Sequence, residues 1–196
     1  NILVARVSLP EERYDDEFHI DQFQHSLVQR LASTPGVEAA ATTTTVPLTG
    51  GNDILTYPEG QRPASQADFR FPQVRWIRGA YFDAASVPIV RGRGLDDARD
   101  TPSTPHVAVI SRAMASRFFP GVDPIGRRLI ADFKDPVTAE VVGVAGDTRD
   151  FGQEAGPVDI LYLSARQMPI GGFSVVVRTS TPACRPRSEL RGQPRE

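Results

Sequence analysis

A helical segment over residues 15–33 constrains the fold most, because it is apolar along one side only. Its apolar residues recur at steps of three and four, which places them in one stripe along the helix. They are Ile20, Phe23, Leu27 and Leu31. A stripe of this kind has to be covered by another element. We expect it to be buried against a sheet that contains the strand "VVGVA".

A second, shorter helix is expected over residues 112–118. Ser111 is suited to cap its N-terminus, and Met114 and Phe118 fall on one face. Both helices end in Pro-Gly-Val, within "TPGV" and "FPGV". Proline disfavours a helical residue before it, and glycine permits the chain to reverse. The shared ending suggests two related strand–helix–strand units, although it is too short to establish a repeat.

Short apolar segments with β-type patterns surround these helices. They are "ILVARVSL", "VEAAATTTTVPL", "HVAVI", "AEVVGVAG", "DILYLSA" and "FSVVVRTS". Helices alternate with strands early in the chain and strands dominate late, so we predict an α+β fold with an α/β-like beginning. The four consecutive threonines favour a strand with one solvent-exposed face, and a polar ligand groove is the alternative.

The β pattern between residues 54 and 78 changes face at Pro72. Apolar residues before the proline share one parity and those after it share the other. These residues are Phe69 and Phe71 before it, and Val74 and Trp76 after it. A one-residue change of face indicates a bulge or a strand that crosses to a second sheet. We therefore expect a mixed-sheet lobe with the two amphipathic helices and a smaller β-rich inserted lobe at about residues 50–75.

Composition excludes several classes of protein. The 196 residues carry a formal net charge of −2, so nucleic acid is not expected as a partner. No apolar run approaches the roughly 18 residues that a membrane-spanning helix needs. One cysteine, Cys184, and three histidines cannot build an internal disulfide or the usual zinc site. The chain begins without methionine or a signal peptide, as a segment of a longer protein would.

Two glycine-containing stretches are candidates for phosphate or dinucleotide sites. In "RFFPGVDPIGRRL", Gly121 and Gly126 have the separation of a phosphate loop, but two arginines follow where lysine and serine are needed. We predict a helix end, a turn and then a strand. In "GVAGDTRDFG" the glycine spacing does not match the dinucleotide fingerprint, so a strand that ends in a turn is predicted.

The acidic loop and the histidines also give no strong site. Asp96, Asp97 and Asp100 could bind calcium, but the loop lacks the EF-hand pattern, so a solvated acidic loop is predicted. No G-x-S-x-G motif selects a serine nucleophile for His19, His25 or His106. We therefore predict no catalytic, cofactor-binding or metal-binding residues, no cofactor, and no enzymatic activity.

Five stretches together resemble the periplasmic core domain of MacB-type and FtsX-type ABC transporter permeases, over roughly residues 1–181. They are "RYDDEFHIDQFQHSLVQRLASTPGVEAAATTTTVPLTGG", "RWIRGAYFDAASVPIVRGRGL", "HVAVISRAMASRFFPGVDPIGRRL", "EVVGVAGDTRDFG" and "DILYLS". No single motif is decisive, but their order and spacing together are fairly specific. In this family the stretch that ends in "PIGRRL" is a scaffold corner without chemistry.

The resemblance implies a two-lobed, non-catalytic domain held on the periplasmic face of the bacterial inner membrane, between two transmembrane helices that lie outside this chain. It would relay ATP-driven motion to a substrate or a partner protein, in efflux, export or lipoprotein-type transport. The implied partners are the rest of the permease and its ATPase, with a periplasmic adaptor or a second permease copy as further candidates. The alternative is a soluble periplasmic hydrolase or ligand-binding domain, which a polar pocket gathering a histidine with a serine or carboxylate would favour.

The resemblance also divides the chain. Residues 1–183 would form the core domain, whereas residues 184–196 make a basic tail with few apolar side chains. In the family an amphipathic helix usually follows the last strand, so a truncated or frameshifted gene would explain this tail. Its composition cannot offset the entropy of ordering it, and we expect it not to be part of the fold.

Overall fold

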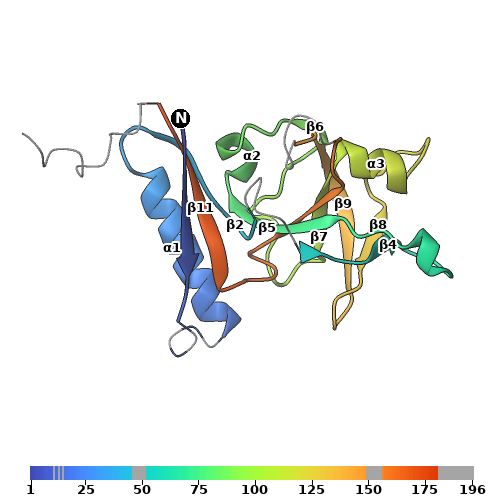
Figure 1. Ribbon diagram of the computed structural model, residues 1–196. Coiled ribbons are helices and arrows are strands. Elements are labelled where there is room, and N and C mark those ends of the chain that lie inside the picture. The colour runs from blue at the N-terminus through green and yellow to red at the C-terminus, as the bar shows by residue number, and fades with distance from the viewer. Residues whose placement is uncertain (11, 13, 15, 46–51, 149–155, 181–196) are drawn as a thin grey trace, which may run out of the picture.

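The computed structural model describes residues 1–180 except residues 11, 13, 15, 46–51 and 149–155 (Figure 1). In the described part of the chain, eleven strands form one mixed sheet, and three α-helices pack on it. The predicted α+β class is confirmed. The predicted tail lies outside the described residues.

The elements follow the expected order along the chain. They are β1 (Ile2–Ser8), α1 (Glu17–Ala32), β2 (Val37–Thr43), β3 (Asn52–Asp53), β4 (Thr56–Pro58), the 3-10 turn η1 (Gln66–Asp68), β5 (Gln73–Gly79), α2 (Tyr81–Ala84), β6 (Ile89–Gly92), β7 (Val107–Ser111), α3 (Arg112–Phe118), β8 (Arg128–Ala131), β9 (Val137–Ala145), β10 (Ile160–Ser164) and β11 (Gly172–Thr179).

The sheet order is β1-β11-β2-β5-β10-β7-β9-β8-β4, with β3 added to β5 and β6 added to β9. The pairs β5–β10 and β7–β9 are parallel, and the other pairs are antiparallel. The last strand of the chain, β11, therefore lies between the first two. Figure 1 shows α1 near the β1 edge of the sheet and α3 near the opposite edge, beside β8 and β4.

Helix α1 packs on β2 and β11, which belong to the sheet that also contains the "VVGVA" strand, as predicted. Its apolar stripe meets Ala40 of β2 and Phe173, Val175 and Val177 of β11. The "VVGVA" strand is β9, which β5, β10 and β7 separate from β2. The stripe and the sheet that covers it were predicted correctly, but the strands directly beneath the helix were not named, because helical periodicity carries no information about which distant strand returns there.

The stripe on α1 is also only half-buried. Phe23 and Leu27 both keep partial exposure, whereas Gln24 and Val28 are the buried residues of the helix. Replacing Leu27 by alanine should therefore cost about 1–2 kcal/mol, below the roughly 2–5 kcal/mol of a fully buried leucine. Leu161→Ala, at a site 1% exposed, is the matched control. Urea denaturation measures the free energy of unfolding of both variants. Equal losses of that free energy would show that Leu27 is fully buried in solution.

The threonine run is buried on both faces, which corrects the prediction of a solvent-exposed face. Thr42 and Thr43 are each 1% exposed. Strand β2 lies between β11 and β5, with α1 on one face and α2 on the other. The hydroxyl of Thr43 is satisfied locally, because it donates to the carbonyl of Thr45 at 2.9 Å. β-Branched side chains favour a strand whether its faces are solvent-exposed or buried, so the threonine run predicts the strand and not its exposure.

Residues 52–58 supply β3 and β4, which join the same hydrogen-bonded sheet. Strand β3 pairs with β5, and β4 pairs with β8 at the far edge. The change of face at Pro72 marks the start of β5, a central strand. A separate β-rich lobe at residues 50–75 stays a prediction.

Candidate functional site

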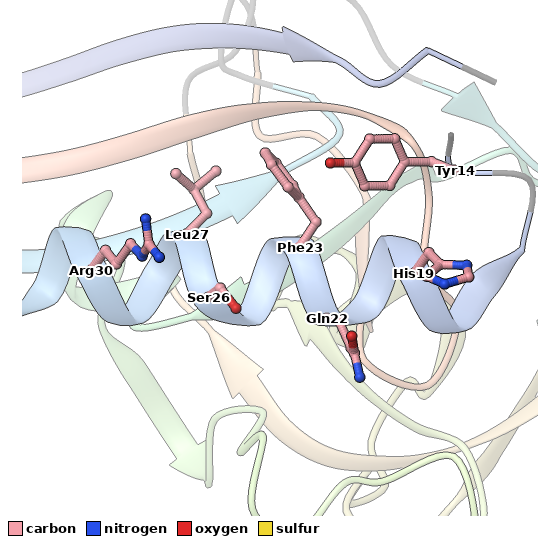
Figure 2. A pocket seen from close by; sticks show the side chains of 7 residues that line it. All are labelled: Tyr14, His19, Gln22, Phe23, Ser26, Leu27 and Arg30. Atoms are coloured by element: carbon pink, nitrogen blue, oxygen red, sulfur yellow. The ribbon is translucent and has the colours of Figure 1, made fainter. Parts of the chain in front are cut away.

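A shallow groove of about 380 Å³ runs along α1, beside the half-buried apolar stripe. It is lined by Tyr14, His19, Gln22, Phe23, Ser26, Leu27 and Arg30. Figure 2 shows Tyr14, Phe23 and Leu27 along one side of the helix and Gln22 pointing away from them. Tyr14 meets Phe23 edge-on, with 5.4 Å between the ring centroids. The floor is thus aromatic and aliphatic, and the rim is polar.

This groove contains a histidine and a serine, so it is the place to test for nucleophilic catalysis. Nδ1 of His19 lies 3.0 Å from Oδ1 of Asp16, which also caps the helix. Ser26 lies seven residues further along the same helix, about 10 Å along the axis. A nucleophile and its base need about 3 Å. The groove therefore does not assemble a catalytic triad from these residues.

The other histidines lie elsewhere. His25 is exposed on α1, on the side that faces Asp97. His106 directly precedes β7, and its carbonyl accepts a bond from the backbone of Glu140. The three histidines are therefore not brought together. Among the described residues, no group of three or more His, Cys, Asp or Glu side chains is placed to hold a metal ion.

Two carboxylates of the acidic loop, those of Asp97 and Asp100, pair with arginines, which corrects the prediction of a solvated loop, whereas Asp96 is exposed as predicted. Asp100 is 3% exposed and accepts two hydrogen bonds from the guanidinium of Arg93, at 2.8 and 2.7 Å. It also accepts one from the backbone of Asp96 at 2.8 Å. Asp97 faces a different arginine, Arg78, at 3.3 Å. These carboxylates hold the loop to the sheet.

Arg78 is the centre of a buried ionic cluster. Its side chain is 1% exposed and pairs with Asp21 of α1 as well as with Asp97. Arg166, two residues after the end of β10, donates to the carbonyl of Asp97. The cluster therefore joins α1, β5, the loop after β6 and the turn after β10. The signal for it was present in the sequence, since "QVRWIRG" places two arginines inside an otherwise apolar strand.

Two carboxylates of this loop have pKa values shifted in opposite directions. Burial raises the pKa of Asp97, and the charge of Arg78 opposes this only in part. Burial also disfavours the charged form of Asp100, but the hydrogen bonds from Arg93 and from the Asp96 backbone outweigh it, so the pKa of Asp100 is lowered. The charged form of Asp100 thus stabilises the fold. The charged form of Asp97 is disfavoured in the folded state, because burial costs it more than its arginine partner returns.

Asp97→Asn and Asp100→Asn should therefore differ in their dependence on pH. The stabilisation from Asp100 is present above the ordinary carboxyl pKa and is lost as pH falls through its lowered pKa. The contribution of Asp97 is present at low pH and is lost as pH rises through its raised pKa. From about pH 3 to about pH 7, the stability of Asp97→Asn relative to wild type should rise and that of Asp100→Asn should fall. Urea denaturation across this range measures both, and parallel curves would contradict the assignment.

The first glycine stretch forms the predicted turn and strand, and the strand predicted for the second is β9, whereas residues 149–152 of the second stretch lie outside the described residues. Helix α3 is capped by Ser111, whose hydroxyl accepts from the Met114 backbone at 3.2 Å. After it, Gly121 and Gly126 adopt positive φ angles of 73° and 78°, and β8 follows. Gly143 lies inside β9. The helix–turn–strand prediction for residues 117–129 is confirmed. That no residue is catalytic or binds a cofactor stays a prediction.

The comparisons with known proteins point to one family. The sequence model described as "MacB-like periplasmic core domain" matches residues 2–185. The comparison with curated proteins gave no match. No helix in the described part of the chain is long and apolar enough to cross a membrane.

Solved structures of permease domains share the fold. The periplasmic region of MacB from Actinobacillus actinomycetemcomitans has a TM-score of 0.60 at 18% identity, covering 96% of this chain and 78% of that one. The extracellular domain of the ABC-type transporter YknZ from Gram-positive bacteria has a TM-score of 0.54 at 16% identity, covering 92% and 84%. A domain of a permease protein from Porphyromonas gingivalis has a TM-score of 0.54 at 20% identity, covering 83% and 69%. The match to the family over residues 2–185 shows that this chain belongs to the MacB-like periplasmic core domains of ABC transporter permeases.

Proposed function

We propose that the chain is a non-catalytic extracytoplasmic domain of an inner-membrane ABC permease, and that it relays ATP-driven motion to a substrate or partner protein. Membership of the family supports the permease context. The relay of motion goes beyond family membership and is argued from the structure below. In this proposal the ATPase acts on the cytoplasmic side and the domain contributes movement and contacts, not chemistry.

The observation that carries the proposal is the position of the first and last described strands. The amino group of Asn1 donates to the carbonyl of Thr179 at 3.1 Å, and the Thr179 backbone donates to the carbonyl of Asn1 at 2.9 Å. Both segments therefore enter and leave the fold at the same end of the neighbouring strands β1 and β11 (Figure 1). A domain inserted between two adjacent membrane helices needs this arrangement.

The construction of the domain also suits a relay. One hydrogen-bonded sheet runs from the strands that hold the chain ends to the opposite edge at β8 and β4. The buried cluster around Arg78 fixes α1 to this sheet and to the loop after β6. Packed cores and continuous ladders deform little, so a rotation applied at β1 and β11 would reach the far edge.

The relay can be tested in the parent permease by replacing residues 2–180 with a flexible Gly/Ser linker. The linker variant should reach the membrane and hydrolyse ATP with its ATPase at the wild-type rate, because no step of hydrolysis uses this domain. It should fail to restore the phenotype of a strain that lacks the permease gene. Restoration by the linker variant at equal expression would contradict the relay.

The alternative is a soluble hydrolase or ligand-binding domain, and the α1 groove, which contains His19 and Ser26, is the described feature that favours it. Its histidine and serine are about two helical turns apart. Hydrolysis of p-nitrophenyl acetate by the intact chain should therefore equal that of the His19→Ala variant. A rate that falls to the uncatalysed level in His19→Ala would favour the hydrolase.

A further inference from the structure

Two open grooves flank the chain where α3 turns into β8, and they share Phe119, Pro120 and Val122. The first, of about 650 Å³, lies toward β6, and the second, of about 540 Å³, lies toward β4. We call the two grooves and the residues between them the corner surface. Pro120 and Val122 form the ridge that divides it, and Val122 is 51% exposed.

The corner surface carries an excess of positive charge. Arg91 and Arg112 line the first groove, and Arg127 and Arg128 line the second. Among the described residues, two carboxylates line them, and each is already paired. Asp123 binds Arg91 at 2.6 Å and Glu59 binds Arg128 at 2.7 Å.

One arginine in each groove is left for another ligand. Arg112 and Arg127 are exposed, and neither forms an ion pair with a carboxylate in the described part of the chain. The chain as a whole is acidic, with a net charge of −2. The positive corner surface is therefore a local feature and not a consequence of overall composition.

Apolar side chains accompany these charges. Val90, 39% exposed, lines the first groove, and Val122 stands on the ridge. Arginines around an exposed aliphatic ridge are typical of the surfaces that bind protein segments, because arginine supplies planar hydrogen bonds and the apolar centre supplies burial. Shallow grooves of this kind suit an extended segment better than a small molecule, which needs an enclosed pocket.

The corner surface lies at the edge of the sheet opposite to the chain ends. Strands β8 and β4 close one edge, whereas β1 closes the other (Figure 1). If β1 and β11 lead to the membrane, the corner surface is separated from them by the intervening strands of the sheet. This placement disfavours a lipid surface as the occupant.

We propose that the corner surface docks an acidic, partly apolar segment of a partner protein, with Arg112 and Arg127 binding its carboxylates and Val122 packing against its apolar side chains. This deepens the proposed function and rests on it for the extracytoplasmic setting of the partner. The recognition itself depends only on this chain, so it can be tested without the permease.

The test uses the intact 196-residue chain and a fluorescein-labelled peptide, Asp-Glu-Leu-Val-Glu-Asp, in a fluorescence anisotropy titration. We expect a dissociation constant of roughly 10–500 μM, which rises with salt because the contacts are charged and exposed. Arg112→Glu with Arg127→Glu should weaken binding by about tenfold or more, since like charges then face each other. Val122→Asp should weaken it by a similar factor.

The matched control reverses two exposed arginines elsewhere, Arg30→Glu with Arg99→Glu, which changes net charge equally. It should leave binding within about twofold of wild type, once long-range charge effects are screened by salt. Thermal unfolding of each variant at the wild-type midpoint shows that the fold is intact.

Three outcomes would overturn the proposal. They are no binding at about 1 mM peptide, an equal loss in the control variant, and tighter binding to vesicles of anionic phospholipid through the same two arginines. None of them bears on whether the domain lies outside the cytoplasm, so failure of the docking surface is distinguishable from failure of the proposed function.

Discussion

Arg78→Met should lower the free energy of unfolding by about 3 kcal/mol, the lower end of the range for breaking a buried ion pair. The arginine side chain is 1% exposed, and methionine fills much of its volume. Removing the guanidinium of Arg78 leaves Asp21 and Asp97 without their shared cation. Because their side chains keep 25% and 28% exposure, water can solvate them in part, which limits the loss. Urea denaturation at neutral pH measures the effect.

The exposed pair of Arg91 and Asp123 provides the matched control. Their side chains are 57% and 51% exposed, so Arg91→Met should cost at most about 1 kcal/mol. Adding Asp21→Asn and Asp97→Asn to Arg78→Met should recover part of the lost stability, because no unpaired carboxylates then remain in the cluster. Equal losses for the two arginine variants would show that the cluster does not hold α1 to the sheet.

Gly143→Ala should destabilise the protein by about 3 kcal/mol or more, because overpacking against backbone cannot be relieved by a side-chain rotation. A Cβ atom at this position would lie 2.0 Å from the carbonyl oxygen of Arg93 and 3.3 Å from a methyl of Val109. To accept it, the chain after β6 would have to move away from β9. Chemical denaturation and the near-ultraviolet circular dichroism spectrum would report the change.

Gly172→Ala is the control for this steric effect. Gly172 begins β11, and an added Cβ there has nothing within 4 Å. It should change stability by less than about 1 kcal/mol in either direction. If Gly143→Ala is as stable as Gly172→Ala, the backbone of Arg93 does not lie as close to β9 as the structure places it.

Local patterns were sufficient to predict the elements. The cap at Ser111, the stripe on α1 and the turn that contains Gly126 each depend on residues within a few positions of one another, so short-range rules apply to them. The sequence could also suggest the family, because several such elements occur in a specific order.

Long-range pairing was not predictable in the same way. Strand β11 returns to lie between β1 and β2, and this decides that α1 packs on β11 and not on β9. The spacing of Gly143 and its neighbouring glycines could be compared with a dinucleotide motif, which it does not match. The sequence could not show that the carbonyl of Arg93, fifty residues earlier in the chain, lies against the backbone of Gly143. The partners of Arg78 come from α1 and from the loop after β6, which no local pattern connects.

Topological labelling in the parent permease tests the central claim, that this domain lies outside the cytoplasm, most directly. In a Cys184→Ser background, Phe71→Cys presents a thiol at a site 55% exposed and outside the corner surface, and Ile110→Cys places one at a site 0% exposed as a control. Spheroplasts treated with a membrane-impermeant maleimide should label Phe71→Cys before lysis, whereas Ile110→Cys should react only after denaturation. Labelling of Phe71→Cys only after the membrane has been broken would contradict the account.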